Sequence, residues 1–571
     1  MSAACGGSGS GDDDGNGDAG EQIVGFTLEP AEAELVVVNR VNVEQTYTAT
    51  VELAGGEVRD VSGEVGLRVD DIRLGFFSDD TFTTSGVAGG RTYVHATYGG
   101  KTLDAVLTVR MEETRVDPSA PPNAPDLFDN ATEDAALAPT IVYPSDGTYV
   151  PPNLGDFETH WTDSGGADLF EVTLQGEYSS TRLFVAGTPL GGSWAAFLPS
   201  EWAIAGETQR GEAMTVTVRG MNVASPTIAG TSAPIGIELT DQNVDGGIYY
   251  WAAAGSQPEG IYRHDMSRPG QPAEAFYTVA ETPGGRCVAC HALSRDGTRM
   301  ALTYDGGNGA ATILDVATRT PLTAIDGSVS WNFATYEPDG TRLVTVFGGA
   351  MSLRDGATGA VLGTVPTGGY ASHPDFSPLG DAIAYVSVAA PGQDWHFTGG
   401  AIVTLPFDPA GGTWGTPTTL VPNTGTNVYY PSWSPDGQWI VFNRSNEDAY
   451  NDASAEMWIV KADGSAEPIK LDSPNIAPGL TNSWVRWAPF EQQLDPNGEM
   501  PEPLMWLTFS STRVFGVRLA AGTPQVWMAP FFPQRAATGA DPSGPAFRLP
   551  FQELGTNNHI AQWTETVVPI D

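Results

Sequence analysis

Hydrophobic and polar residues alternate in short runs along the first 240 residues. Between residues 22 and 113 the runs are Ile23–Leu28, Glu34–Val38, Gln45–Val51, Gly89–Tyr98 and Leu107–Val109. A second block, from 138 to 240, contains Phe157–Trp161, Leu169–Leu174 and Met214–Arg219. Runs of this length with period two, broken by Gly and Asp, are typical of half-buried β-strands joined by turns. The pattern predicts two successive β-sandwiches.

Two segments lack this alternation. Residues 1–21 are rich in Gly, Ser and Asp, and they have too few apolar residues to form a core. Residues 114–137 are rich in Pro, Asp and Ala. We expect the first segment to be a disordered tether and the second to be a linker between the two sandwiches.

The last 330 residues contain a repeat. Four copies of a turn flanked by apolar residues are Ser294–Met300, Glu337–Leu343, Ser377–Ile383 and Ser434–Ile440, and a weaker copy begins at Ala488. An aromatic residue or leucine precedes each copy (Leu293, Tyr336, Phe376, Trp433 and Trp487). A strand–turn–strand unit that returns every 40 to 57 residues is typical of a β-propeller blade.

Five copies supply five inner strands, and the C-terminal run Asn558–Thr564 supplies a sixth. Three further runs precede the first copy and have no inner strand of their own: Ile248–Trp251, Gly260–His264 and Ala275–Thr278. Joining the C-terminal strand to these three would complete a sixth blade and leave no open sheet edge. The sequence therefore predicts an all-β chain whose region 241–571 is a six-bladed propeller closed by its C-terminal strand.

Each of the three regions resembles a known family. Residues 22–113 resemble bacterial Ig-like modules in the ending Gly89–Gly100, and residues 138–240 are similar to a fibronectin type III-like sandwich. The turn copies of 241–571 resemble the repeat of TolB-type six-bladed propellers, whose motif is Ser-Pro-Asp-Gly followed by an apolar strand. The resemblance implies an envelope propeller that serves as a platform for protein partners, with the two sandwiches as spacers or docking modules.

The segment Cys287-Val288-Ala289-Cys290-His291 is the c-type haem attachment pattern. In this pattern two thiols add to the haem vinyl groups, and the adjoining imidazole binds the iron as proximal ligand. Two other interpretations stay open. The pair Cys287 and Cys290 can form a local disulfide, or the motif can hold a metal, although the only other cysteine, Cys5, lies far away in the chain.

The repeat also predicts which residues surround the motif. In register with the turns, Cys290 corresponds to Phe333, His373, Tyr430 and Trp484. His373 therefore shares its ring of positions, and His559 is offset from that ring by one residue. These two histidines are the candidates for the distal iron ligand, unless each is a hydrogen-bonded histidine of the channel rim or the iron is five-coordinate.

Composition excludes several other functions. The net charge of −42 argues against nucleic-acid binding and against docking on anionic lipid. The sequence contains no apolar run of about 20 residues and none of the common hydrolase or phosphate-loop motifs. One acidic segment, Asn446–Asp452, has oxygen ligands suited to calcium, although a solvated loop explains it as well because its spacing fits no EF-hand.

The N-terminus indicates export. Small residues precede Cys5 and a Gly/Ser/Asp tether follows it, as after a bacterial lipoprotein cleavage site. The alternative is an ordinary disordered N-terminus with an incidental cysteine. We expect a periplasmic or cell-surface lipoprotein that carries one haem c for electron transfer or redox sensing, with a redox partner or envelope protein as its partner. The alternatives are a protein-binding propeller with a Cys287–Cys290 disulfide and an enzyme with peroxidase-like activity.

Overall fold

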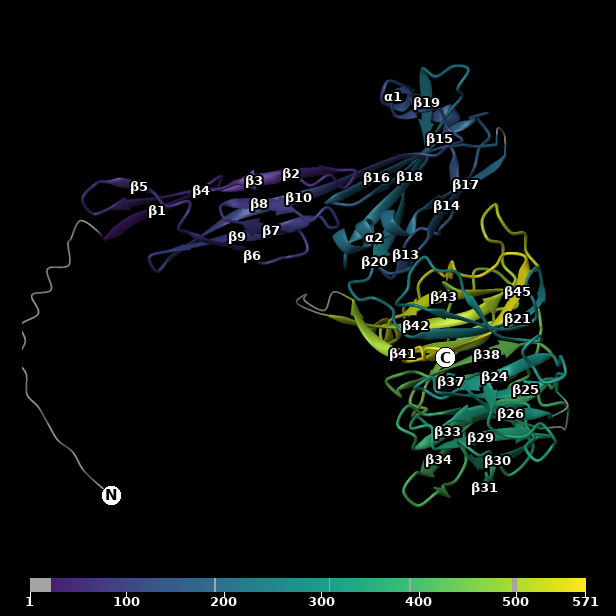
Figure 1. The fold of residues 1–571 in the computed structure, drawn as a ribbon. Coiled ribbons are helices and arrows are strands. Elements are labelled where there is room, and N and C mark those ends of the chain that lie inside the picture. The colour runs from purple at the N-terminus through teal and green to yellow at the C-terminus, as the bar shows by residue number, and fades with distance from the viewer. Residues whose placement is uncertain (1–21, 189–190, 308, 390–391, 495–500, 571) are drawn as a thin grey trace, which may run out of the picture. The chain divides into compact units, whose positions relative to one another are not determined.

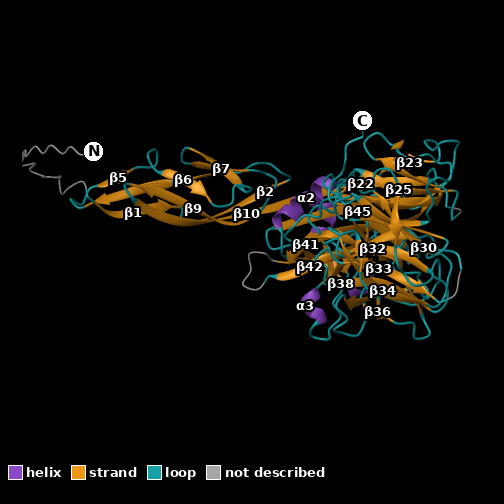
Figure 2. Ribbon diagram, turned by 90° about the horizontal axis from the view of Figure 1, so that it is seen from below, coloured by secondary structure: helices purple, strands orange, loops and turns teal. Residues whose placement is uncertain are grey.

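The computed structural model describes residues 22–188, 191–307, 309–389, 392–494 and 501–570. Figure 2 shows that strands make up nearly all of its regular structure. The chain divides into two units, Met1–Glu113 and Thr114–Asp571. No described helix is long and apolar enough to cross a membrane. Cys5 lies outside the described residues.

The first unit is a β-sandwich, as the alternation predicts. The inward residues of its long hairpin, among them Val94, Ala96, Leu107 and Val109, are buried. One sheet has the order β2-β10-β9-β6, and the others have the orders β1-β4-β5 and β3-β8-β7. The strands are β1 Ile23–Glu29, β2 Glu32–Val38, β3 Glu44–Thr46, β4 Thr48–Leu53, β5 Val58–Asp60, β6 Gly66–Val69, β7 Gly75–Ser78, β8 Thr81–Thr84, β9 Gly90–Tyr98 and β10 Lys101–Val116.

The second unit begins with the segment predicted as a linker, and the structure folds this segment instead. Ala124 and Phe128 of helix α1 (Ala124–Asp129) are buried in a small core with Phe184 and Met221. Strand β11 (Thr132–Glu133) then pairs with β19, and a 3-10 turn follows (Ala135–Leu137). The Pro- and Asp-rich composition did not reveal this packing, because a single buried phenylalanine fixes the segment on the sandwich.

The second sandwich follows. One sheet has the order β12-β14-β17, and the other is built on β15, β16 and β18, with β20 and β19 beside β18. Trp161 and Phe170 lie in its core. The elements are β12 Thr140–Tyr143, β13 Thr148–Val150, β14 Phe157–Thr162, β15 Leu169–Gln175, β16 Ser179–Ala186, β17 Gly192–Phe197, α2 Pro199–Thr208, β18 Ala213–Met221, β19 Ile228–Thr231 and β20 Ile235–Leu239.

The rest of the second unit is a six-bladed propeller. Figure 1 labels many of its strands, from β21 to β45. Five blades follow one another along the chain, each numbered from its innermost strand outward. The first blade consists of β24 Val288–Leu293, β25 Arg299–Tyr304, β26 Ala311–Asp315 and β27 Thr320–Pro321, and the second of β28 Phe333–Tyr336, β29 Arg342–Phe347, β30 Ala350–Asp355 and β31 Val361–Thr364. The third consists of β32 Ala371–Phe376, β33 Ala382–Val388, β34 Gly400–Asp408, β35 Thr413–Trp414 and β36 Thr418–Val421, and the fourth of β37 Asn427–Trp433, β38 Trp439–Ser445, β39 Glu456–Lys461 and β40 Ile469–Lys470. The fifth consists of β41 Ser483–Leu494, β42 Glu502–Ser511, β43 Gln525–Phe531 and β44 Phe547–Arg548, with helix α3 Pro533–Ala536 before β44.

The sixth blade confirms the predicted closure. Its sheet has the order β23-β22-β21-β45, in which β21 Gly247–Gly255, β22 Gly260–Asp265 and β23 Glu274–Thr278 pair with the C-terminal strand β45 Thr556–Thr564. Each inner strand contacts the next, and β45 contacts both β41 and β24. The six inner strands therefore surround one central channel.

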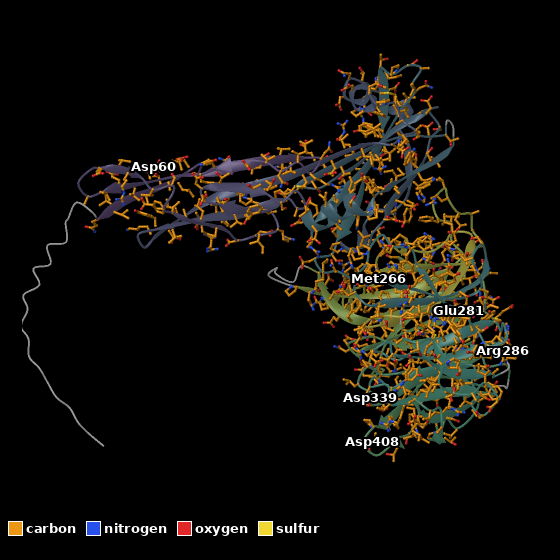
Figure 3. All side chains as sticks on the ribbon, in the orientation of Figure 1. Asp60, Met266, Glu281, Arg286, Asp339 and Asp408 are labelled. Atoms are coloured by element: carbon orange, nitrogen blue, oxygen red, sulfur yellow. The ribbon has the colours of Figure 1, made fainter. Side chains whose placement is uncertain are left out.

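The repeated turns hold the blades together locally. In the first copy Asp296 accepts hydrogen bonds from the Ser294 hydroxyl (2.6 Å) and the Thr298 amide (3.0 Å). Asp339, labelled in Figure 3, accepts from the Thr341 amide at 2.9 Å in the second copy. The glycines at the fourth position, Gly297, Gly340, Gly380 and Gly437, have φ of +69° to +72°, a conformation that other residues rarely adopt.

Candidate functional site

The Cys287–His291 segment lies at the innermost strand of the first blade, and strand β24 begins within it, at Val288. The ladder between β24 and β25 shifts between Val288 and His291, so that Ala289 and Cys290 form a bulge. A bulge interrupts the alternation of faces along a strand. This local irregularity determines which way the two thiols and the imidazole face.

Both cysteines line one cavity of about 220 Å³, which we call the thiol cavity. Its walls are largely apolar and include the rings of Trp251, Trp395, Tyr450 and Trp484, and Gly306 and Gly307 also line it. Arg286, directly before Cys287, is labelled in Figure 3 and forms an ion pair with Asp305. The repeat placed Trp484 at the level of Cys290, whereas sequence reasoning missed Trp395 and Tyr450, because these two come from loops outside the repeated turns.

Both thiols are free and their pKa values are high. Partial burial raises the pKa of Cys287 to about 12, and Glu259 adds to the effect because its Oε1 accepts a hydrogen bond from Sγ at 2.7 Å. Burial raises the pKa of Cys290 to about 12 as well. The two thiols are therefore protonated at neutral pH.

These pKa values predict slow alkylation of the two thiols in protein that carries no haem. At pH 8 we expect iodoacetamide to modify Cys287 and Cys290 at least about tenfold more slowly than free cysteine, because only the thiolate reacts. The rates, followed by mass spectrometry, should rise steadily as pH increases above 9. Glu259→Gln should accelerate labelling of Cys287 and leave Cys290 unchanged. Labelling of the native protein as fast as free cysteine would contradict the described environment.

A second cavity, of about 180 Å³, lies along the channel and is lined by the inner strands of all six blades. We call it the channel cavity. Residues one and two positions before each turn form its wall: Leu293, Tyr336, Phe376, Trp433, Trp487 and Trp563, then Ala292, Thr335, Asp375, Ser432, Arg486 and Gln562. The partly exposed turn prolines Pro338, Pro378, Pro435 and Pro489 line it too.

A cluster of rings lies between the two cavities. It consists of Phe333, His373, Tyr430 and Trp484, which occupy the ring of positions that the repeat predicted, and we call it the aromatic plug. The ring centroid of Tyr430 is 4.0 Å from that of His373 and 4.1 Å from that of Trp484. Cys290, Asn332, Trp484 and Ile560 line both cavities, so the plug region separates them.

The histidines do not face the thiol cavity. His291 is buried and lines the channel cavity. Its Nδ1 lies 3.2 Å from the Ala289 carbonyl oxygen, and its Nε2 lies 3.4 Å from that of Tyr249. Burial lowers its pKa to about 4.

His373 also lines the channel cavity, so the structure brings it together with His291. Its Nδ1 accepts a hydrogen bond from the Tyr430 amide at 3.5 Å, whereas its Nε2 has no partner among the described residues. His559 lines neither cavity. Its ring centroid is 6.0 Å from that of Trp251, burial lowers its pKa to about 4, and its neighbour Ile560 occupies the plug-level position.

The thiols and the imidazole therefore differ in how well they fit a haem c. Cys287 and Cys290 share a cavity with apolar, aromatic walls, which suits two thioether bonds to a macrocycle. The imidazole of His291 faces the other cavity in this conformation. The donor set fits attachment through the thiols, and it does not present His291 to the same face.

Two charged residues in the channel cavity were not singled out by sequence reasoning. Asp375 and Arg486 both lie two positions before a turn, where the other copies carry Ala, Thr, Ser or Gln. Burial raises the pKa of Asp375 to about 6 and lowers that of Arg486. Comparing the repeats at this position would have revealed both, because the other copies are neutral there.

The acidic segment Asn446–Asp452 stabilises its own loop. Asp452 accepts hydrogen bonds from the backbone amides of Glu447 (2.8 Å) and Ser454 (2.7 Å), and Asp448 lies 2.6 Å from the imidazole of His396. Within the described ranges, no group of three or more His, Cys, Asp or Glu side chains is arranged to hold a metal ion. Calcium at this segment stays a prediction.

No protein-family model matches the chain, and no curated protein matches it either. Several solved structures share a distant likeness with the chain. A putative TolB from Agrobacterium tumefaciens is 16% identical over 56% of this chain and 99% of that chain, with a TM-score of 0.31. TolB from Acinetobacter baumannii is 13% identical over 62% and 80%, with a TM-score of 0.35. Hydrazine synthase from Kuenenia stuttgartiensis is 11% identical over 44% and 73%, with a TM-score of 0.28. The six-bladed architecture rests on the strand pairings of this chain itself.

Proposed function

We propose that this protein is an exported protein of the bacterial cell envelope whose propeller carries one haem c for electron transfer or redox sensing. The carrying observation is that the two cysteines of the attachment motif line one aromatic-walled cavity at the channel. The lipoprotein-like residues around Cys5 support export and a lipid anchor. A redox partner or another envelope protein would be its partner.

In this proposal Cys287 and Cys290 form the two thioether bonds. A bound haem supplies reversible one-electron chemistry at iron. The rings of Trp251, Trp395 and Trp484 exclude water from the cavity, which affects the redox potential. His291 would bind the iron only if its ring left the Tyr249 carbonyl oxygen, and His373 and His559 stay the candidates for a second iron ligand.

The test is a pyridine haemochrome spectrum and in-gel haem staining of the full chain, expressed in the periplasm with the c-type maturation machinery. We expect the native chain and Cys5→Ser to retain covalent haem. Cys290→Ala should lose at least one thioether bond, and the double variant with Cys287→Ala should lose the stain entirely. A colourless native protein would overturn the proposal.

The second candidate is a protein-binding propeller with a Cys287–Cys290 disulfide. It is favoured by the channel cavity, which is lined by polar side chains such as Arg486 and Gln562 and has a rim of partly exposed prolines. A colourless protein whose motif peptide gains two mass units on oxidation would support this candidate.

A further inference from the structure

The channel cavity contains an arginine whose hydrogen-bonding capacity is largely unused. A guanidinium group carries five N–H donors. Among the described residues, Arg486 donates one hydrogen bond, from a terminal guanidinium nitrogen to the Val485 carbonyl oxygen (3.0 Å). Its side chain lines the channel cavity, where burial disfavours its charge. Arg486 is partly exposed to the cavity, and the nearby Asp375 favours its charge without a direct ion pair. Its unused N–H donors can therefore bind an anion that enters the cavity.

The nearest carboxylate is already satisfied by other groups. Asp375 accepts a hydrogen bond from the Trp433 amide at 2.7 Å, and the Ser432 side chain also donates to it. No ion pair joins Asp375 to Arg486 within the part of the chain that the structure describes. Asp375 therefore makes the electrostatic potential of the cavity more negative, and it leaves the N–H donors of Arg486 free for a ligand.

Other polar atoms of the same wall lack partners. The side chains of Tyr336 and His373 are 6% and 2% exposed. The Tyr336 hydroxyl and the His373 Nε2 have no hydrogen-bond partner among the described residues. The indole N–H of Trp433 is also without one. These three atoms are almost fully covered in this conformation, so they do not contact the space of the cavity, and the site rests on Arg486.

The shape and chemistry of the wall define the ligand class. Around Arg486 the wall combines aromatic rings and prolines with polar side chains, among them Thr335, Ser432 and Gln562, so a ligand needs one anionic end and a body that packs on the rings. The planar guanidinium matches a carboxylate through two parallel hydrogen bonds. A dianion such as phosphate would be repelled more strongly by Asp375. We infer that the channel cavity binds a carboxylate, held at Arg486 and packed on the rings of the wall, supplied either by a small organic acid or by the C-terminus of a peptide. This inference does not depend on haem.

The experiment is isothermal titration calorimetry on the full chain with two pairs of probes. The small pair is 3-phenylpropanoate and 3-phenylpropanamide. The peptide pair is acetyl-Ala-Pro-Phe as the free acid and as its C-terminal amide. We expect the acids to bind and the amides to bind at least about tenfold more weakly, since charge-assisted hydrogen bonds to Arg486 are lost. A peptide acid that binds about tenfold more tightly than the small acid identifies a chain terminus as the source, and comparable affinities identify small acids.

Three variants sharpen the test. Arg486→Met should weaken binding of the acids about tenfold to a hundredfold, whereas Asp375→Asn should tighten it several-fold by removing a like charge. Arg444→Met, which removes a partly buried arginine stacked on Trp458 outside the cavity, should leave binding unchanged. Thermal melts check that each variant is folded, and Asp375→Asn carries the test if Arg486→Met is not. Failure of both acids to bind at millimolar concentration, or equal binding of acids and amides, would overturn the inference.

Discussion

Removing residues 556–571 is expected to abolish the cooperatively folded propeller. This truncation deletes β45, the inner strand of the sixth blade, which pairs with β21 and contacts β24 and β41. It removes the buried side chains Ile560, Ala561 and Trp563. Loss of a buried tryptophan costs about 3–5 kcal/mol and loss of a buried isoleucine about 2–5 kcal/mol. Together they reach the total stability of an ordinary domain, about 5–15 kcal/mol.

The measurement is thermal and urea unfolding followed by near-UV circular dichroism, together with limited proteolysis. The matched control ends after Val568, whose carbonyl oxygen still accepts a hydrogen bond from the Arg263 guanidinium at 2.7 Å. The control should melt like the full chain, whereas the truncation at 556 should be degraded and should expose the edge of β21. A truncated chain with an unchanged cooperative transition would show that the ring does not need its last strand.

The sequence predicts this closure for a physical reason. Each turn copy must be followed by outer strands, and the three runs from Ile248 to Thr278 had no inner strand of their own. The C-terminal run Asn558–Thr564 supplied an inner strand without outer strands, and an open edge is unfavourable. The number of blades and the pairing of β45 with β21 follow from that count. The register of the plug also follows, since Phe333, His373, Tyr430 and Trp484 lie together as the turns align them.

The cavity that each side chain of the cysteine motif faces could not be predicted in the same way. Five of the six inner strands contain a register shift, and the shift in β24 falls at Ala289 and Cys290. In the other bulged strands a residue with φ near +50° occupies this level: His373, Tyr430, Trp484 and Ile560. None is a glycine, so no sequence signal marks the bulge. Period-two alternation therefore could not assign His291 to the channel cavity.

The pair Asp375 and Arg486 shows a second limit of prediction from the sequence. Asp375 and Arg486 stand at equivalent positions in two blades, about 110 residues apart in the sequence, and only the ring closure brings them into one cavity. The linker prediction failed for a related reason, because the burial of Phe128 depends on contacts with Phe184 that composition does not record. Long-range packing decides both cases.

Replacing Tyr430 by alanine is expected to destabilise the propeller by about 3–5 kcal/mol. Tyr430 is fully buried, and its ring packs on His373, Trp484 and Tyr429, with centroids 4.0, 4.1 and 5.1 Å away. The Tyr430→Ala substitution leaves a void in the aromatic plug, between the thiol cavity and the channel cavity. The surrounding blades cannot close this void, because their own strand pairings fix them. Urea unfolding measures the loss, and the m-value should stay unchanged because the same surface is exposed on unfolding.

The matched variant Tyr430→Phe should behave in the opposite way. The Tyr430 hydroxyl is buried, burial raises its pKa well above the usual value, and it has no hydrogen-bond partner among the described residues. A buried hydroxyl without a partner costs about 1–3 kcal/mol, so removing it should leave stability unchanged or raise it by about 1 kcal/mol. If Tyr430→Phe instead costs more than about 1 kcal/mol, the hydroxyl is hydrogen-bonded in the folded protein. The plug would then be a polar junction between the two cavities, because that partner would have to lie within it.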